Sequence, residues 1–106
     1  EVSELAHIYS TNSKLLSLSE LYTLANQKVA RGENPVAIYR TAYEQNANDP
    51  VAKLNYANAL LQYDKNAKEA YRVLSTIQSD SRAKLPTAIA LDMMGRKAEA
   101  EKLYFN

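Results

Sequence analysis

The chain of 106 residues has no cysteine, no tryptophan, two glycines and three prolines. Without cysteine, disulfide scaffolds, thiolate metal sites and cysteine nucleophiles are excluded. Because glycine occurs only at positions 32 and 95, neither a phosphate-binding loop nor a dinucleotide-binding fingerprint can be written. A sheet with many glycine turns is disfavoured for the same reason. The composition is typical of a helical protein.

The sequence also lacks an excess of charge of either sign and any long apolar run. Thirteen Lys and Arg residues face twelve Asp and Glu residues, so the formal net charge is +1. A phosphate-binding surface needs clustered cations, and we therefore expect no nucleic-acid partner. No segment approaches the roughly 20 apolar residues that a membrane-spanning helix needs. The 46% share of apolar residues supports a modest core.

Catalytic groups are scarce. His7 is the one histidine, and no cysteine or second histidine is present to complete a metal site with it. The carboxylates are scattered among lysines and arginines, an arrangement typical of solvated helix faces. We therefore expect a protein that is not an enzyme and that has no catalytic, cofactor-binding or metal-binding residues.

Apolar residues recur at steps of three and four, which predicts amphipathic helices along most of the chain. Ser17 and Glu20 form a capping-box pattern at the start of the first clear helix, and Gly32 supplies a left-handed stop. Asn34 and Pro35 predict the cap and first residue of the next helix. The buried stripes expected on these two helices contain Leu21, Tyr22, Leu24, Ala25, Val29, Val36, Tyr39, Ala42 and Tyr43.

Similar start and stop signals predict four later helices. Asp49 and Pro50 open the third helix, and Asn66 with Glu69 forms a second candidate capping box at the start of the fourth. Gly95 stops the fifth helix, and the sixth runs to the end. The buried residues expected on these helices are Leu54, Ala57, Leu60, Leu61, Ala70, Val73, Leu74, Ile77, Ala88, Leu91, Met94, Ala98, Leu103 and Tyr104.

Two places depart from this regular pattern. Leu5, Ile8 and Tyr9 predict a short helix, with a break over residues 10–13. Pro86 lies where the repeat pattern expects helix. It is read either as a first-turn proline of a helix that starts late, or as a kink caused by the lost backbone donor.

Small residues recur at a period of about thirty residues, and larger residues follow them in the second helix of each pair. The small residues are Ala25, Ala57, Ala88, Ala70 and Ala100, and the larger ones are Tyr39, Leu74 and Tyr104. This alternation resembles the tetratricopeptide-repeat family, and residues 42–50 resemble that family's turn between repeats. Asp64 aligns with Gly32 and Gly95, where the family has a turn glycine.

The resemblance implies an all-α fold, a TPR-like antiparallel helix-hairpin solenoid that forms a single domain over residues 1–106. An N-terminal helical extension is expected over residues 1–16. Three hairpins are expected over residues 17–48, 49–80 and 81–106, the last of them truncated. In such a solenoid each hairpin completes the core of its neighbour, and the first helices line the concave side.

A narrower resemblance lies near the end of the chain. Residues 88–104 resemble the Leu-Asp-x-x-Gly-Arg-x-x-Glu-Ala segment of the tetratricopeptide lipoproteins of tight-adherence (Flp-type) pilus assembly. This resemblance implies a fragment of a protein-interaction scaffold, pilotin-like or an assembly factor of a pilus or secretin machine. The expected location is the periplasm, as a lipoprotein anchored in the outer membrane. The alternative is a cytoplasmic TPR chaperone or adaptor of a secretion system.

The concave side supplies the expected partner-binding residues. Leu54, Leu61 and Leu85 would make apolar contacts with a protein or peptide partner. Asparagine side chains offer a donor and an acceptor to an extended backbone. In the alternative reading these asparagines merely solvate the groove. The groove candidates are Tyr22, Asn26, Leu54, Asn55, Asn58, Leu61, Arg82, Leu85 and Ile89.

Two further expectations concern binding. Asn26, Asn55 and Arg82 lie at positions resembling the carboxylate clamp of chaperone-binding relatives. Tyr22 and Pro86 replace two of the clamp's cations, so clamping of a C-terminal carboxylate is not expected. A truncated end that exposes residues 103–105 is expected to self-associate, because a solenoid without a polar cap leaves apolar surface bare.

Overall fold

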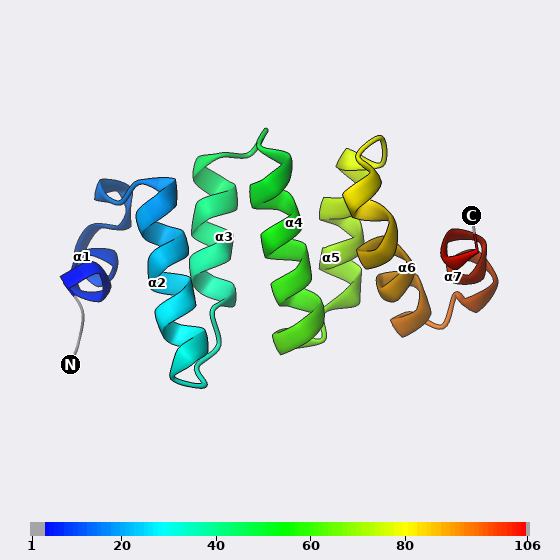
Figure 1. Cartoon of the computed structure of the whole chain (residues 1–106), viewed down its shortest axis with the longest axis horizontal. Helices are drawn as coiled ribbons and strands as arrows, with labels where there is room; N and C mark the ends of the chain where they lie inside the picture. Colours follow the sequence, from blue (N-terminus) through cyan, green and yellow to red (C-terminus); the bar gives the residue numbers. More distant parts are fainter. Residues whose placement is uncertain (1–3, 106) are drawn as a thin grey trace.

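Helices connected by short loops stand side by side in one row in the computed structural model, which describes residues 4–105 (Figure 1). Within these residues the fold is all-α and no strand is present, which confirms the all-α part of the predicted fold class. The elements are α1 (Glu4–Asn12), η1 (Ser13–Leu15), α2 (Leu18–Ala30), α3 (Val36–Gln45), α4 (Pro50–Ala59), η2 (Leu60–Asp64), α5 (Ala67–Leu74), η3 (Ser75–Ile77), η4 (Ser81–Ala83), α6 (Lys84–Met93) and α7 (Lys97–Tyr104).

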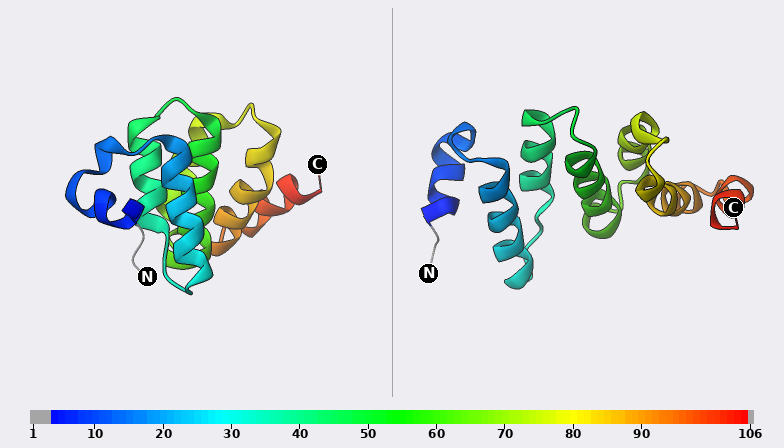
Figure 2. Two further views of the ribbon diagram at one scale, coloured as in Figure 1. Left: turned by 60° about the vertical axis from the view of Figure 1, so that its left-hand side comes forward. Right: turned by 45° about the horizontal axis from the view of Figure 1, so that its top comes forward.

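Each helix packs mainly against the helices before and after it in the chain. Neighbouring helices alternate in direction, and α1 and α7 lie at opposite ends of the row, as the right-hand view of Figure 2 also shows. The row measures 46 × 27 × 17 Å. This sequential order is consistent with helix hairpins, in which α2 pairs with α3, α4 with α5 and α6 with α7.

Local side-chain hydrogen bonds fix where the helices begin. At α2 the capping box is confirmed, because the Glu20 amide donates to Ser17 Oγ at 3.1 Å and the Ser17 amide donates to Glu20 Oε1 at 2.9 Å. At α4 the Val51 amide donates to Asp49 Oδ1 at 2.9 Å, and Pro50 occupies the first turn. At α3 the expected cap is wrong by one residue: Pro35 and not Asn34 is the N-cap, the helix begins at Val36, and the Asn34 side chain accepts from the Val36 amide at 2.8 Å.

Only half of the second expected capping box is present. The Glu69 amide donates to Asn66 Oδ1 at 3.2 Å. The Glu69 carboxylate does not return to the Asn66 amide, since it accepts two hydrogen bonds from Arg72 and one from the Tyr56 hydroxyl. Hydrogen bonding by Arg72 is the main reason why the pKa of Glu69 lies below its ordinary value. The Arg40 guanidinium donates to the Tyr56 hydroxyl at 3.1 Å, so this network connects α3, α4 and α5.

In the turn after α4 the structure differs from the sequence alignment that matched Asp64 with Gly32 and Gly95. Gly32 and Gly95 have positive φ angles of 75° and 82°, as expected, but the left-handed residue of the middle turn is Lys65, with φ 53°, and not Asp64. The physical reason is the π-helical turn η2, which continues α4 and accommodates one extra residue. The Lys65 and Asn66 amides both donate to the carbonyl of Leu60 at the end of this turn.

The core consists of two clusters. One lies among α1, α2 and α3, and the other extends from α3 to α6. The Tyr39 side chain packs against both clusters, which makes the core continuous. Most of the expected stripes are buried, but Ala98, Val29 and Tyr104 are exposed, and the fully buried Ile38 was missed.

The structure tests both departures from the regular pattern, the break expected over residues 10–13 and the position of Pro86. The break expected over residues 10–13 is wrong for most of that range, because α1 continues as far as Asn12 and the short helix η1 begins at Ser13. The Ser10 and Thr11 hydroxyls donate to the carbonyl of His7, which satisfies these side chains without ending the helix. Pro86 is the third residue of α6, which confirms the first-turn reading.

We predict that Lys65→Gly stabilises the protein. A left-handed conformation costs a residue with a side chain about 1–2 kcal/mol, of which the greater freedom of glycine in the unfolded state cancels about 0.5–1 kcal/mol. The free energy of unfolding, measured by urea denaturation, should rise by about 0.5–1 kcal/mol. The matched control Lys53→Gly, inside α4, should lower it by about 1 kcal/mol. A loss of stability in Lys65→Gly would contradict this account of the turn.

Candidate functional site

Two adjoining hollows lie between alternate helices of the row. The first, of about 310 Å³, is formed by α2, α3 and α4 with η2, and the second, of about 370 Å³, by α4, η2 and α6. They share Asn58 and Gln62 and therefore form one continuous surface, which we call the amide groove. Its lining residues are Asn26, Val29, Tyr39, Asn55, Asn58, Ala59, Gln62 and Tyr63 in the first hollow, and Asn58, Leu61, Gln62 and Ile89 in the second.

Helical spacing brings the amides of the groove together. Asn55, Asn58 and Gln62 are separated by three and four positions, so they lie along one face of α4 and its π-helical turn. Asn26 of α2 completes the row from the neighbouring hairpin. Within residues 4–105, the side chains of Asn26, Asn58 and Gln62 make no hydrogen bond to another residue. Their donors and acceptors are therefore open to a ligand.

Two tyrosines in ring contact, Tyr22 and Tyr39, lie at the first hollow. The rings of Tyr22 and Tyr39 lie 6.1 Å apart with a 48° tilt. Burial is the main cause that raises the pKa of both tyrosines above its ordinary value, and Tyr63 raises that of Tyr39 further. The Tyr22 hydroxyl is buried without a partner in good hydrogen-bond geometry, although the nearby Asn55 side chain opposes the rise in its pKa.

The lining of the amide groove is uncharged. No aspartate, glutamate, lysine or arginine occurs among the described residues that line either hollow. The polar groups of the lining are side-chain amides and the hydroxyls of Tyr39 and Tyr63. The second hollow is also lined by the apolar side chains of Leu61 and Ile89. Such a surface favours hydrogen bonding to neutral groups over the attraction of ions.

The structure brings together five of the nine residues expected from the sequence, namely Asn26, Asn55, Asn58, Leu61 and Ile89. Tyr22 lies beside Tyr39 and near Asn55 but not in the lining. Leu54 and Leu61 are each 7% exposed and belong to the same core cluster; Leu61 also borders the second hollow, whereas Leu54 is not among the lining residues of either hollow.

Two expected residues lie elsewhere. The Arg82 guanidinium donates two hydrogen bonds to the Asp80 carboxylate, at 3.0 and 2.7 Å, and this contact lowers the pKa of Asp80 to about 2. Leu85 lines a different hollow at the C-terminal end, together with Leu103 and Tyr104. The groove therefore does not contain the apolar contact expected at Leu85.

Sequence reasoning missed the contribution of Val29, Tyr39 and Tyr63 to the groove. Tyr39 was assigned to the core stripe of its helix, where it is indeed partly buried. Tyr39 both packs against the core clusters and lines the hollow, a dual role that periodicity does not reveal. Tyr63 gave no signal because it lies in the π-helical turn, where regular helical spacing fails.

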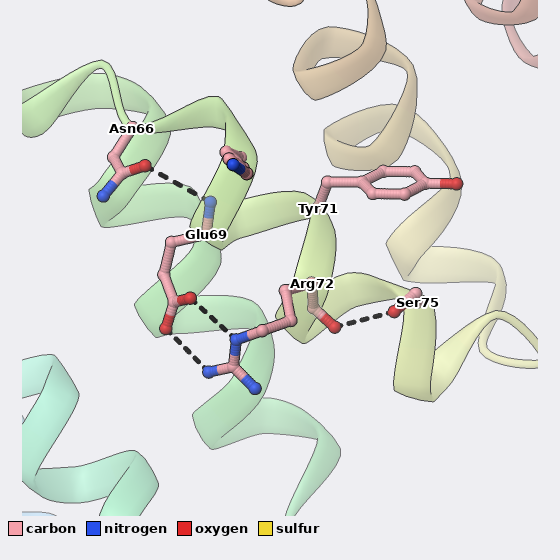
Figure 3. Close-up of a pocket in the computed structure, with 6 residues that line it drawn as sticks. Asn66, Glu69, Tyr71, Arg72 and Ser75 are labelled. Atoms are coloured by element: carbon pink, nitrogen blue, oxygen red, sulfur yellow. Dashed lines mark hydrogen bonds and ion pairs between the residues drawn. The ribbon is translucent and has the colours of Figure 1, made fainter.

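Another hollow, of about 530 Å³, lies along α5 and its cap. Several of its polar side chains already have partners within α5, as Figure 3 shows: Asn66 accepts from the Glu69 amide, Glu69 pairs with Arg72, and Ser75 donates to the Arg72 carbonyl. These hydrogen bonds hold the α5 helix and leave few groups for a ligand. The amide groove is therefore the better candidate for a binding site.

Neither a metal site nor a membrane helix emerges from the described part of the chain. Residues 4–105 contain no group of three or more His, Asp or Glu side chains placed to hold a metal ion. No helix among them combines the length and the apolar character needed to cross a membrane. Comparison with protein families, curated proteins and solved structures finds no match to this chain.

We predict a loss of stability at alkaline pH that depends on the buried tyrosines. Because the folded protein raises the pKa of Tyr22 and Tyr39, their stabilising effect is present below pH 10 and is lost as the pH rises through the higher folded-state values. The melting temperature, followed by circular dichroism, should fall from pH 8 to pH 11 by less in Tyr22→Phe/Tyr39→Phe than in the unmodified chain.

The control for this prediction is Tyr104→Phe, which changes a tyrosine that is 43% exposed. Its fall in melting temperature should equal that of the unmodified chain. An equal fall in the double variant would show that burial of Tyr22 and Tyr39 does not govern the alkaline transition.

Proposed function

We propose that this protein is a non-catalytic scaffold of the tetratricopeptide-repeat type, which holds an extended segment of a protein partner in the amide groove. The observation that carries the proposal is the uncharged row of Asn26, Asn55, Asn58 and Gln62 across two helix hairpins. Because no enzyme chemistry is needed for such binding, the scarcity of catalytic side chains is compatible with it.

The periodic turns support the solenoid part of this proposal. Left-handed residues occur at Gly32, Lys65 and Gly95, each between the first and second helix of a pair. Ala57 and Ala88 are buried at corresponding places of α4 and α6, and Ala25 at that of α2. Helix pairs that repeat in this way place their first helices on a shared side, where the amide groove lies.

The chemistry of the groove favours an extended peptide backbone. A primary amide offers two donors and an acceptor, which match the N–H and C=O groups that an extended segment leaves unpaired. Leu61 and Ile89 then provide an apolar place for one partner side chain. Since no ion pair is involved, the affinity should change little with salt concentration.

Within this class, the segment of residues 88–104 favours an envelope-associated assembly factor of a pilus or secretin machine, located in the periplasm or anchored at the outer membrane. A cytoplasmic chaperone or adaptor of a secretion system has the same fold and remains the alternative. A pull-down with the chain from bacterial envelope extract and from cytosol separates them: recovery of a pilus or secretin subunit from the envelope supports the first, and recovery of a secretion substrate from the cytosol alone supports the second.

We predict that Asn55→Ala/Asn58→Ala weakens peptide binding. Twelve-residue peptides are selected on the chain by phage display, and the affinity of a selected peptide is measured by isothermal titration calorimetry. Each lost neutral hydrogen bond costs about 0.5–1.5 kcal/mol, so the double variant should bind about 10-fold more weakly or worse. Methylation of the peptide's backbone nitrogens should reduce affinity similarly, because it removes the N–H groups that donate hydrogen bonds to the side-chain amide oxygens.

The matched control is Asn48→Ala, which removes an exposed asparagine from the turn before α4. It should leave affinity unchanged, and both variants should keep the circular dichroism spectrum of the unmodified chain. Equal affinity of the double variant and the control would refute the assignment of the groove.

A further inference from the structure

One side chain joins the loop of the first hairpin to the π-helical turn of the second. Asn34 Nδ2 donates to Asp64 Oδ1 at 2.8 Å, although the two residues are 30 positions apart in the chain. The Asn34 oxygen accepts from the Val36 amide, also at 2.8 Å, so both ends of this side-chain amide are engaged. Asn34 belongs to the loop after α2, and Asp64 is the last residue of η2. This loop and the end of α4 lie at the same edge of the row (Figure 1).

The hydrogen bond connects the two walls of the first hollow of the amide groove. Asn26 and Val29 line this hollow from α2, and Gln62 and Tyr63 line it from η2, directly before Asp64. The helix α2 packs mainly against α3 and not against α4, so the two walls contact each other little. Among the described residues, no other side-chain hydrogen bond in good geometry joins residues 18–35 to residues 50–64.

A π-helical turn is an uncommon conformation that depends on support from its surroundings. It occurs mostly as a single turn inserted in an α-helix, often at a functional site. In η2 the Lys65 and Asn66 amides both donate to the Leu60 carbonyl, and Lys65 takes a left-handed conformation, which is unfavourable for a residue with a side chain. If Asp64 is released from its partner, the turn can return to α-helical hydrogen bonding, which changes the direction of the side chains that it carries.

We propose that Asn34 and Asp64 are positioning residues of the amide groove, whose hydrogen bond holds η2 in its π-helical form and directs Gln62 and Tyr63 toward a segment bound in the first hollow. Neither Asn34 nor Asp64 lines the groove, so each acts through the side chains of η2 and not by contact with the partner. Side chains that are already directed at a ligand lose less freedom on binding, which raises affinity. Because the pair acts on the same groove, its role depends on the proposed function.

The chemistry of the pair suits this role. A carboxylate that accepts from an amide makes a charge-assisted hydrogen bond, which is stronger than one between neutral groups. An asparagine offers an acceptor and a donor on one rigid group, so the hydrogen bond from the Val36 amide orients the Asn34 nitrogen toward Asp64. An aspartate at position 34 would keep the first of these contacts and lose the second.

Exchange of the donor and the acceptor tests the proposal, with the same phage-selected peptide and calorimetry. Asn34→Asp keeps the acceptor for the Val36 amide but places a carboxylate against Asp64, so affinity should fall by about 3- to 10-fold, the loss expected for one neutral hydrogen bond. Asp64→Asn keeps an acceptor and should bind like the unmodified chain. Asn34→Asp/Asp64→Asn reverses the hydrogen bond and should restore the affinity. Both residues are exposed, so no core packing is removed, and circular dichroism verifies folding.

A coupling measurement separates positioning from a general loss of stability. In the unmodified chain, Gln62→Ala should weaken binding by about 3- to 10-fold. In the Asn34→Asp background it should cost no more than about 2-fold, because a misdirected Gln62 no longer contacts the peptide. Ile89→Ala in the second hollow should cost the same in both backgrounds. The matched control, Asn48→Asp, adds the same charge at an exposed asparagine and should leave affinity unchanged.

Amide hydrogen exchange, followed by NMR, gives a readout that needs no partner. In the free chain, the Lys65 and Asn66 amides should exchange at least about 5-fold faster in Asn34→Asp, because the turn that protects them opens more often. Their rates should return to those of the unmodified chain in Asn34→Asp/Asp64→Asn. Amides inside α2 should be unaffected in both variants.

The outcomes distinguish this proposal from the proposed function. If no peptide binds the unmodified chain, the proposed function is wrong and the positioning role is wrong with it. If peptides bind, the positioning role alone is overturned by any of three results: unchanged affinity in Asn34→Asp, an equal cost of Gln62→Ala in both backgrounds, or unchanged exchange of the Lys65 and Asn66 amides.

Discussion

The structure depends on apolar side chains that are buried jointly by helices that follow one another in the chain. Tyr39 packs against both core clusters, and Val73 and Leu74 of α5 share a cluster with Ala83 and Ala90 of the next pair. Burial across the boundary between pairs is favourable because it removes apolar area from water that neither pair can cover alone. A row of helices with contacts mainly between chain neighbours is the direct result.

The same constraint explains why polar groups gather on one side. The faces of α4 that contact α3 and α5 are occupied by small and apolar residues such as Ala52 and Ala57, which have no exposed surface. The face toward α2 and α6 is not needed to the same extent for packing, so Asn55, Asn58 and Gln62 can stand there in contact with water. A surface that is not needed for packing can carry hydrogen-bonding side chains at little cost, because they remain in contact with water.

The sequence predicts helix ends well where a local interaction sets them. The capping box of Ser17 and Glu20 depends on residues three positions apart, and the stops at Gly32 and Gly95 depend on the backbone freedom of glycine, so both are visible in the sequence. The second capping box is only partial because the Glu69 carboxylate binds Arg72, three positions ahead in the same helix, and the Tyr56 hydroxyl of α4 instead of the Asn66 amide. Spacing alone does not tell which of several possible partners a carboxylate binds.

Candidate site residues were predicted where they continue a helical face, and missed where they do not. Asn55 and Asn58 follow regular spacing from the buried positions of α4. Leu54 borders the same face of α4, but its side chain is part of the core cluster and only 7% exposed. The extent of such coverage depends on how closely two helices approach each other, which their separate sequences do not specify.

The π-helical turn connects these two aspects, the packing of the row and the lining of the groove. An extra residue in a regular helix would rotate all following positions by about 100°, and would turn α5 away from its neighbours. In η2 the wider turn absorbs this residue, and Lys65 takes the left-handed conformation that starts α5 in register. Leu61, Gln62 and Tyr63 all lie within this turn and all border the groove. The local departure from regular helix therefore widens the lining of the groove while the core on both sides of it remains continuous.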